Sequence, residues 1–205
     1  MSPTLGGMLA GLLLCAAADA QSPSPAPTPD LEAGRAVFAA KQCGRCHQAR
    51  GAVGVGPALE DLRRPQGEME LAGRLWNHVP AMAAALGQNG LKWPEISATE
   101  MAALMTYLSA DSRRDPAPNP SQGQVTLIRK GCLKCHSLAG EGGRVQPDLA
   151  ARRTDYQSAP TWAAAMWTHT PRMAQMAREQ GVPYPRFSGS EMTNLVGYLR
   201  TTARR

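Results

Sequence analysis

The feature that most constrains the fold of this chain is a five-residue motif, C-x-x-C-H, that occurs twice. It reads Cys43-Gly44-Arg45-Cys46-His47 in the first half and Cys132-Leu133-Lys134-Cys135-His136 in the second, 89 residues further on. A zinc ribbon also uses C-x-x-C pairs, but places them about 15 to 20 residues apart. A thioredoxin-like dithiol expects a βαβ pattern around the motif, and this chain shows none. Neither alternative fits this spacing well.

The motif is typical of covalent haem attachment. Two thiols one helical turn apart can add to the two vinyl groups of a haem, and the adjacent histidine then presents its imidazole to the iron. Two motifs predict two haem c groups as cofactors. The predicted haem-binding residues are the attachment cysteines Cys43, Cys46, Cys132 and Cys135 and the iron ligands His47 and His136.

The similarity of the two halves extends beyond the motif and indicates an internal duplication. At an offset of 91 residues, Trp76-x-His78-x-Pro80-x-Met82 recurs as Trp167-x-His169-x-Pro171-x-Met173. We therefore predict a first domain at 30–111, a linker rich in Pro, Ser and Gly at 112–124, and a second domain at 125–205. Domains of this size bury little apolar surface, so a haem would complete each core.

The first 29 residues predict export. An apolar stretch at 5–18 precedes Ala18-Asp19-Ala20, the small-x-small pattern of a signal-peptide cleavage site. We expect residues 1–20 to be a signal peptide and 21–29, with four prolines, to be an extended spacer. An uncleaved anchor and lipidation at Cys15 are the alternatives, and only these would tie the protein to a membrane.

The hydrophobic periodicity predicts an all-α fold, because no segment shows sustained strand alternation. Helices are expected at 31–41, 68–78, 99–108, 125–130, 159–168 and 190–200. The helix at 99–108 follows Ser97 and has Glu100 in its first turn, which is a typical N-terminal signal.

The chain resembles two tandem class I cytochrome c domains, each wrapped around a covalently attached haem. The resemblance implies that the first and last helices of each domain cross at a glycine and bulky residues. It also implies that the chain near a proline, about ten residues after the histidine that binds the iron, accepts a hydrogen bond from the other ring nitrogen of that histidine. The matching positions are Gly34, Phe38 and Tyr107, then Gly123, Leu127 and Tyr198, and the prolines Pro57 and Pro147.

The resemblance implies a methionine as distal iron ligand, usually from the loop before the last helix. Here those loops, 90–94 and 181–185, contain no methionine. We favour Met82 and Met173, with His78 and His169 as alternatives and an open site as a further one. Pro80 is expected to interrupt or begin a helix. Met101 and Met192, inside the last helices, fit core packing better.

The repeated aromatics Trp76 and Trp167, with Trp93 and Tyr184, are interpreted as haem-packing residues.

The charge is uneven between the halves. Residues 30–115 carry ten basic and ten acidic side chains, whereas 116–205 carry twelve basic and five acidic. A basic second domain favours redox partners with acidic docking surfaces, and nucleic acid is not an expected partner.

The predicted function is that of a periplasmic dihaem electron carrier and not an enzyme. The alternative is a haem enzyme, or a cytochrome subunit of a periplasmic oxidoreductase, with one open haem site.

Overall fold

The computed structural model describes residues 31–52 and 54–202. The expected signal peptide at 1–20, including Cys15, and the spacer at 21–29 lie outside the described residues. Within the described part of the chain, no helix combines the length and the apolar character needed to cross a bilayer.

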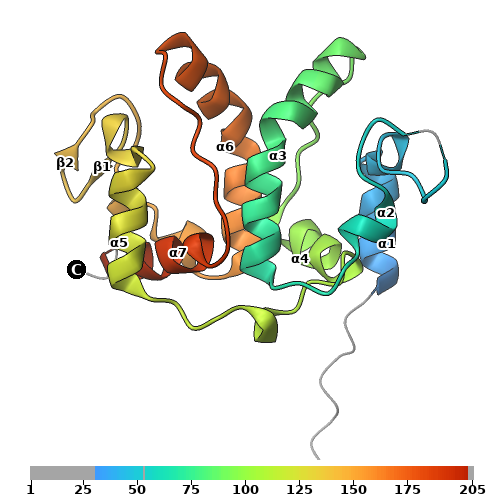
Figure 1. The fold of residues 1–205 in the computed structure, drawn as a ribbon, viewed down its shortest axis with the longest axis horizontal. Helices are drawn as coiled ribbons and strands as arrows, with labels where there is room; N and C mark the ends of the chain where they lie inside the picture. Colours follow the sequence, from blue (N-terminus) through green and yellow to red (C-terminus); the bar gives the residue numbers. More distant parts are fainter. Residues whose placement is uncertain (1–30, 53, 203–205) are drawn as a thin grey trace, which may run out of the picture.

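The described chain is mainly helical, which confirms the all-α prediction, and its one sheet is a short antiparallel hairpin that pairs Ser137 with Gly142. The two halves repeat the same order of helices, α1, α3, α4 and then α5, α6, α7 (Figure 1). The elements are α1 (Leu31–Ala40), η1 (Cys43–Arg45), α2 (Leu59–Leu62), α3 (Glu68–Gln88), α4 (Ala98–Tyr107), η2 (Ser112–Arg114), α5 (Pro120–Arg129), η3 (Cys132–Lys134), β1 (Ser137–Leu138), β2 (Glu141–Gly142), η4 (Leu149–Ala151), η5 (Arg153–Tyr156), α6 (Ala159–Glu179) and α7 (Glu191–Thr202).

Each domain is closed by the crossing of its first and last helices, α1 with α4 and α5 with α7 (Figure 1). Glycine permits the close approach at both crossings. A Cβ atom at Gly34 would lie 2.2 Å from the carbonyl oxygen of Ala103, and one at Gly123 would lie 2.0 Å from that of Asn194. These contacts confirm the crossing that the family resemblance implied.

Three of the expected helix boundaries are wrong. The helix expected at 125–130 begins five residues earlier, at Pro120, inside the segment that we expected to be linker. The physical reason is a start signal: the Asn119 side chain accepts a hydrogen bond from the Gln122 amide at 3.1 Å, and proline is favoured in the first turn. The helices expected to stop at 78 and 168 continue to Gln88 and Glu179.

Both long helices therefore pass through a proline, Pro80 in α3 and Pro171 in α6. The expected interruption at Pro80 is wrong, because the carbonyl that loses its helical partner finds another donor, as described below. The chain leaves both helices at a glycine two residues past the last helical residue, Gly90 after α3 and Gly181 after α6, with φ angles of 66° and 63° in the left-handed region that glycine adopts at little cost.

Helices α3 and α6 lie side by side at the centre of the molecule and join the two domains (Figure 1). The segment between the domains also returns to α3. The Asp115 carboxylate accepts hydrogen bonds from the amide of Met69 at 2.9 and 3.0 Å, at the N-terminus of α3, where the helix dipole favours negative charge.

Candidate haem-binding sites

Each C-x-x-C-H motif forms a tight turn after the first helix of its domain. The residue before the motif has a left-handed backbone, with φ 59° at Gln42 and 72° at Gly131, and a 3-10 turn follows. The amide of the motif histidine then donates to the carbonyl of the first cysteine at 3.0 Å in both domains. This turn brings both thiols and the imidazole to the wall of one pocket.

The two motifs face separate pockets. We call the pocket lined by Cys43, Cys46 and His47 the first pocket, and the one lined by the equivalent residues of the second motif the second pocket. The four cysteines are half-buried and form no disulfide with one another. Burial raises the pKa of Cys43 and of Cys132 to about 11, so both remain neutral at physiological pH.

The hydrogen bond made by each motif histidine defines which nitrogen can bind a metal. Nδ1 of His47 lies 3.0 Å from the carbonyl oxygen of Pro57, and Nδ1 of His136 lies 2.9 Å from that of Pro147. A carbonyl only accepts, so Nδ1 must carry the proton, and Nε2 keeps its lone pair for iron. These prolines are the two that the resemblance indicated.

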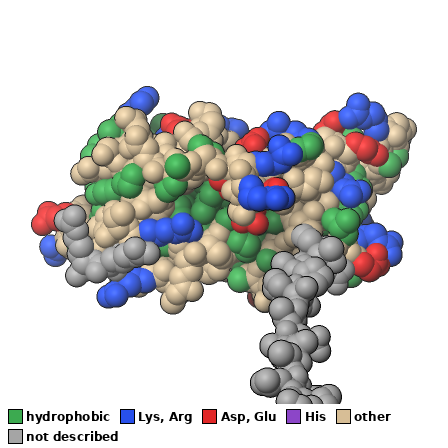
Figure 2. All heavy atoms as spheres, turned by 90° about the horizontal axis from the view of Figure 1, so that it is seen from below, with side chains coloured by type: hydrophobic (Ala, Val, Ile, Leu, Met, Phe, Trp, Pro, Cys, Tyr) green, Lys and Arg blue, Asp and Glu red, His purple; other side chains and the backbone are tan. Residues whose placement is uncertain are grey.

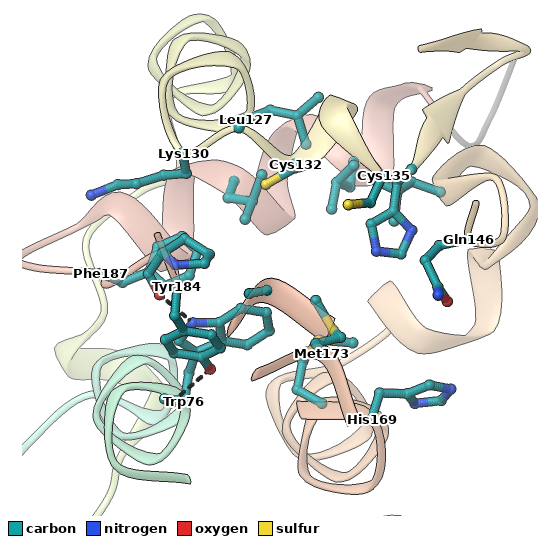
Figure 3. A pocket seen from close by; sticks show the side chains of 18 of the residues that line it. Trp76, Leu127, Lys130, Cys132, Cys135, Gln146, His169, Met173, Tyr184 and Phe187 are labelled. Atoms are coloured by element: carbon teal, nitrogen blue, oxygen red, sulfur yellow. Dashed lines mark hydrogen bonds between the residues drawn. The ribbon is translucent and has the colours of Figure 1, made fainter. Parts of the chain in front are cut away.

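The candidate distal side chains lie on α3 and α6, opposite the motifs. Met82 and His78 line the first pocket, and Met173 and His169 line the second. In the second pocket Met173 points into the cavity toward the wall that carries Cys132 and Cys135, whereas the His169 ring extends along the edge and away from the cysteines (Figure 3).

Burial also separates the two methionines from the two histidines. Both methionines are half-buried, and both histidines are exposed. The histidines also use Nδ1 locally: His78 lies 2.7 Å from the Arg74 carbonyl, and His169 lies 2.7 Å from the Ala165 carbonyl.

The remaining repeated methionines are core residues. Met101 and Met192 are 0% and 2% exposed, and neither lines a pocket. The sulfur of Met192 accepts a hydrogen bond from the indole nitrogen of Trp162 at 3.1 Å. Their packing agrees with the interpretation made from their helical spacing.

The donor set and the pocket walls fit a haem. Apolar side chains form most of both linings, as a porphyrin requires, and basic residues stand among them. Lys41 and Arg74 in the first pocket, and Lys130 and Arg152 in the second, could neutralise propionate carboxylates. The two lysines are held by equivalent ion pairs, each 2.8 Å long, to the glutamates at positions 100 and 191.

Two features of these sites were not predicted from the sequence, although the replacement of Gly56 by Gln146 before the second proline is visible in it. The first is an asymmetry: the side-chain amide of Gln146 donates to the sulfur of Met176 at 3.1 Å in the second pocket, while the first pocket has Gly56 and Ala85 at the corresponding places. When the two halves are aligned at an offset of 91 residues, Met176 corresponds to Ala85. The sequence therefore contained a signal for this difference between the domains.

The second missed feature is that each pocket receives an aromatic side chain from the other domain. Trp76, on α3 of the first domain, lines the second pocket, and Trp167, on α6 of the second domain, lines the first. Figure 3 shows Trp76 entering the second pocket beside Tyr184. Trp93 and Tyr184, by contrast, line the pockets of their own domains.

A pair of helical domains with C-x-x-C-H motifs in apolar pockets defines a haem-binding electron-transfer protein of the c type. The chain belongs to the cytochrome c family, because the family model described as Cytochrome c matches it twice, at residues 31–111 and 121–203. Comparison with curated proteins and with solved structures found no match.

Proposed function

We propose that this chain is a dihaem electron carrier that holds one haem c in each domain and passes electrons one at a time between redox partners. The observation that carries the proposal is that the same arrangement occurs in both pockets. Two thiols stand beside an imidazole whose Nδ1 is bonded to a proline carbonyl, at 3.0 Å in one domain and 2.9 Å in the other. A haem iron bound there supplies reversible one-electron chemistry.

The residues of the chain would hold such a group as follows. The cysteine pairs provide the covalent attachment, and His47 and His136 provide Nε2 as proximal ligand. Met82 and Met173 are our candidates for the distal position, because they are half-buried in the pockets and matched in the two domains. Apolar walls limit the access of water, which keeps the change in solvent structure small when the charge of the site changes.

A carrier is favoured over a haem enzyme by the equivalence of the distal side chains. An enzyme needs an iron position that substrate can reach, yet both pockets present a methionine from the same turn of α3 or α6. Carbon monoxide binding to the reduced protein separates these functions. No binding at either haem supports the carrier, and rapid binding at one haem would support the enzyme or subunit alternative.

We further propose export to the periplasm and an acidic redox partner. Export is supported by the sequence pattern at 1–20, and N-terminal sequencing of the mature protein should begin at Gln21. An anchored or lipidated protein would instead keep the apolar segment or carry lipid at Cys15. The acidic partner is supported by the excess of basic residues in the second domain.

The central experiment is a count of covalently bound haem. Pyridine haemochrome absorbance per polypeptide should give two, the haems should resist extraction by acidic butanone, and reductive titration should be reversible. One haem per chain, or none, would refute the proposed dihaem carrier.

A further inference from the structure

Trp76 and its neighbour Asn77 link the first domain to the second pocket. The Trp76 ring is 6% exposed and stacks on Tyr184, with centroids 5.6 Å apart and planes at 19°. Its indole nitrogen donates to the carbonyl of Pro185 at 2.7 Å. Asn77, the next residue, adds two hydrogen bonds to the backbone of Phe187, at 2.7 and 2.8 Å. These contacts fix the indole as part of the wall of the second pocket.

Trp167 makes the equivalent contacts in the opposite direction. Its ring stacks on Trp93 with centroids 4.3 Å apart, and its indole nitrogen donates to the carbonyl of Pro94 at 2.7 Å. The exchange of tryptophans is therefore reciprocal, and it uses the same positions of the internal repeat in both domains.

The prolines inside α3 and α6 supply the matching acceptors. Pro80 and Pro171 stand four residues after the two tryptophans and lack the N–H that would bond the tryptophan carbonyl within the helix. The freed carbonyl of Trp76 accepts from the Tyr184 hydroxyl at 3.0 Å, and that of Trp167 accepts from the Trp93 indole at 3.1 Å. In each domain, the W-x-x-x-P segment therefore directs one donor, the indole N–H, and one acceptor, the tryptophan carbonyl, toward the other domain.

Each long helix consequently serves both pockets at once. Helix α3 presents Met82 and Leu75 to its own pocket and Trp76 to the other, and α6 presents Met173 and Trp167 in the same way. A movement of either helix changes both pockets together.

We propose that Trp76 is a positioning residue for the haem site of the second domain, and Trp167 for that of the first. This rests on the proposed function, because it requires a haem in each pocket. Each indole excludes water from the other domain's site and fixes the aromatic residue that stacks on it. Exclusion of water disfavours the more highly charged ferric form, so loss of the indole should lower the midpoint potential of the haem across the interface.

The test measures both midpoint potentials in Trp76→Phe and Trp167→Phe by spectroelectrochemical titration of the full-length protein. The haems are assigned with optical tags. Cys132→Ala or Cys43→Ala leaves one vinyl group conjugated with the porphyrin ring, so the haem of that domain absorbs at longer wavelength. Gln88→Ala, at the exposed end of α3, is the control for a change on the same helix.

The expected result is a crossed pattern. Trp76→Phe lowers the potential of the haem tagged by Cys132→Ala and leaves the other unchanged, and Trp167→Phe does the reverse. A shift confined to the haem of the substituted residue's own domain, equal shifts of both haems, or no shift would overturn the proposal. A haemochrome count below two in the parent protein would instead refute the dihaem function itself.

Pro80→Ala provides a second route that retains the tryptophan. Alanine is a good helix former and restores an N–H that competes with the Tyr184 hydroxyl for the Trp76 carbonyl. We expect the potential of the second-domain haem to shift, although the substitution lies in the first domain. An unchanged second-domain potential in Pro80→Ala would count against the positioning role even if Trp76→Phe proved unstable.

Discussion

At the residue scale, the backbone next to each motif histidine controls the imidazole. The His47 ring is held by the Pro57 carbonyl, and Gly56 leaves the space for it, since a Cβ there would lie 2.7 Å from two ring atoms. The second domain reaches the same bond with a loop one residue longer and with Gln146 before its proline. The two sites thus share the hydrogen bond between histidine and proline carbonyl and differ in the residues around it.

Met82→Ala and Met173→Ala test the distal ligands. Each should remove half of the weak long-wavelength charge-transfer absorption that ferric haem shows when a thioether is bound. Each should also lower the potential of one haem, because a soft thioether favours the ferrous state. Met101→Leu is the control, since this buried residue lies outside both pockets and a volume-conserving change costs less than about 1.5 kcal/mol. Full absorption in either alanine variant would exclude that methionine as a ligand.

Gly56→Ala tests the control of His47. The added methyl group should displace the ring and weaken its bond to Pro57, and a less basic imidazole should raise the potential of the first-domain haem. Gly44→Ala is the matched control, because a Cβ there meets only the Phe38 ring at 3.5 Å, an ordinary contact. Equal potentials in both variants would show that the glycine is not needed to seat the imidazole.

At the element scale, two kinds of helix contact define the molecule. Glycines allow α1 to cross α4 and α5 to cross α7 at backbone contact distance, which closes each domain. Prolines inside α3 and α6 leave carbonyls free for the other domain, which joins the two. The sequence indicated the first kind through the family resemblance. The second was missed because a proline within a helical pattern ordinarily predicts an interruption.

Gly34→Ala and Gly123→Ala should each destabilise the protein by about 3 kcal/mol, the upper end of the usual cost of overpacking, because the neighbouring atoms are backbone carbonyls that cannot move aside easily. Gly87→Ala, on the exposed side of α3 with nothing within 4 Å, should stabilise it by about 0.4 to 1 kcal/mol. Denaturant unfolding of the three variants measures these changes. A crossing variant as stable as the parent would show that the helices can separate without loss.

At the scale of the whole molecule, the two domains share a wall and differ in charge. On the face seen in Figure 2, basic and acidic side chains are interspersed over both domains. Three exposed basic residues, Lys134, Arg144 and Arg178, lie within two positions of residues that line the second pocket, and the acidic residues Asp155 and Glu179 lie there as well. A basic rim there would attract an acidic partner to the edge of the site.

The charge of this rim can be tested with small redox reagents of opposite sign. Oxidation of the reduced protein by hexacyanoferrate(III), an anion, should slow with rising salt and slow further, about tenfold, in the variant Arg144→Glu/Arg178→Glu. Oxidation by the cation hexaammineruthenium(III) should change in the opposite direction. The double variant Arg113→Glu/Arg114→Glu, at exposed positions in η2, changes the net charge by the same amount and is the control. Similar effects in the control would assign the result to overall charge and not to the rim.

The amino-acid sequence alone was sufficient to predict the class of fold and the residues of the haem sites. Covalent haem attachment depends on residues that are close along the chain, so Cys43, Cys46 and His47 and their repeats could be predicted from spacing, and helical periodicity is equally local. The tertiary structure alone decided which domain each tryptophan serves, because that depends on how α3 and α6 pack. It also decided that the helices continue past Pro80 and Pro171. A proline costs a helix one hydrogen bond, and only the folded molecule shows that a side chain 108 residues away from Trp76 replaces it.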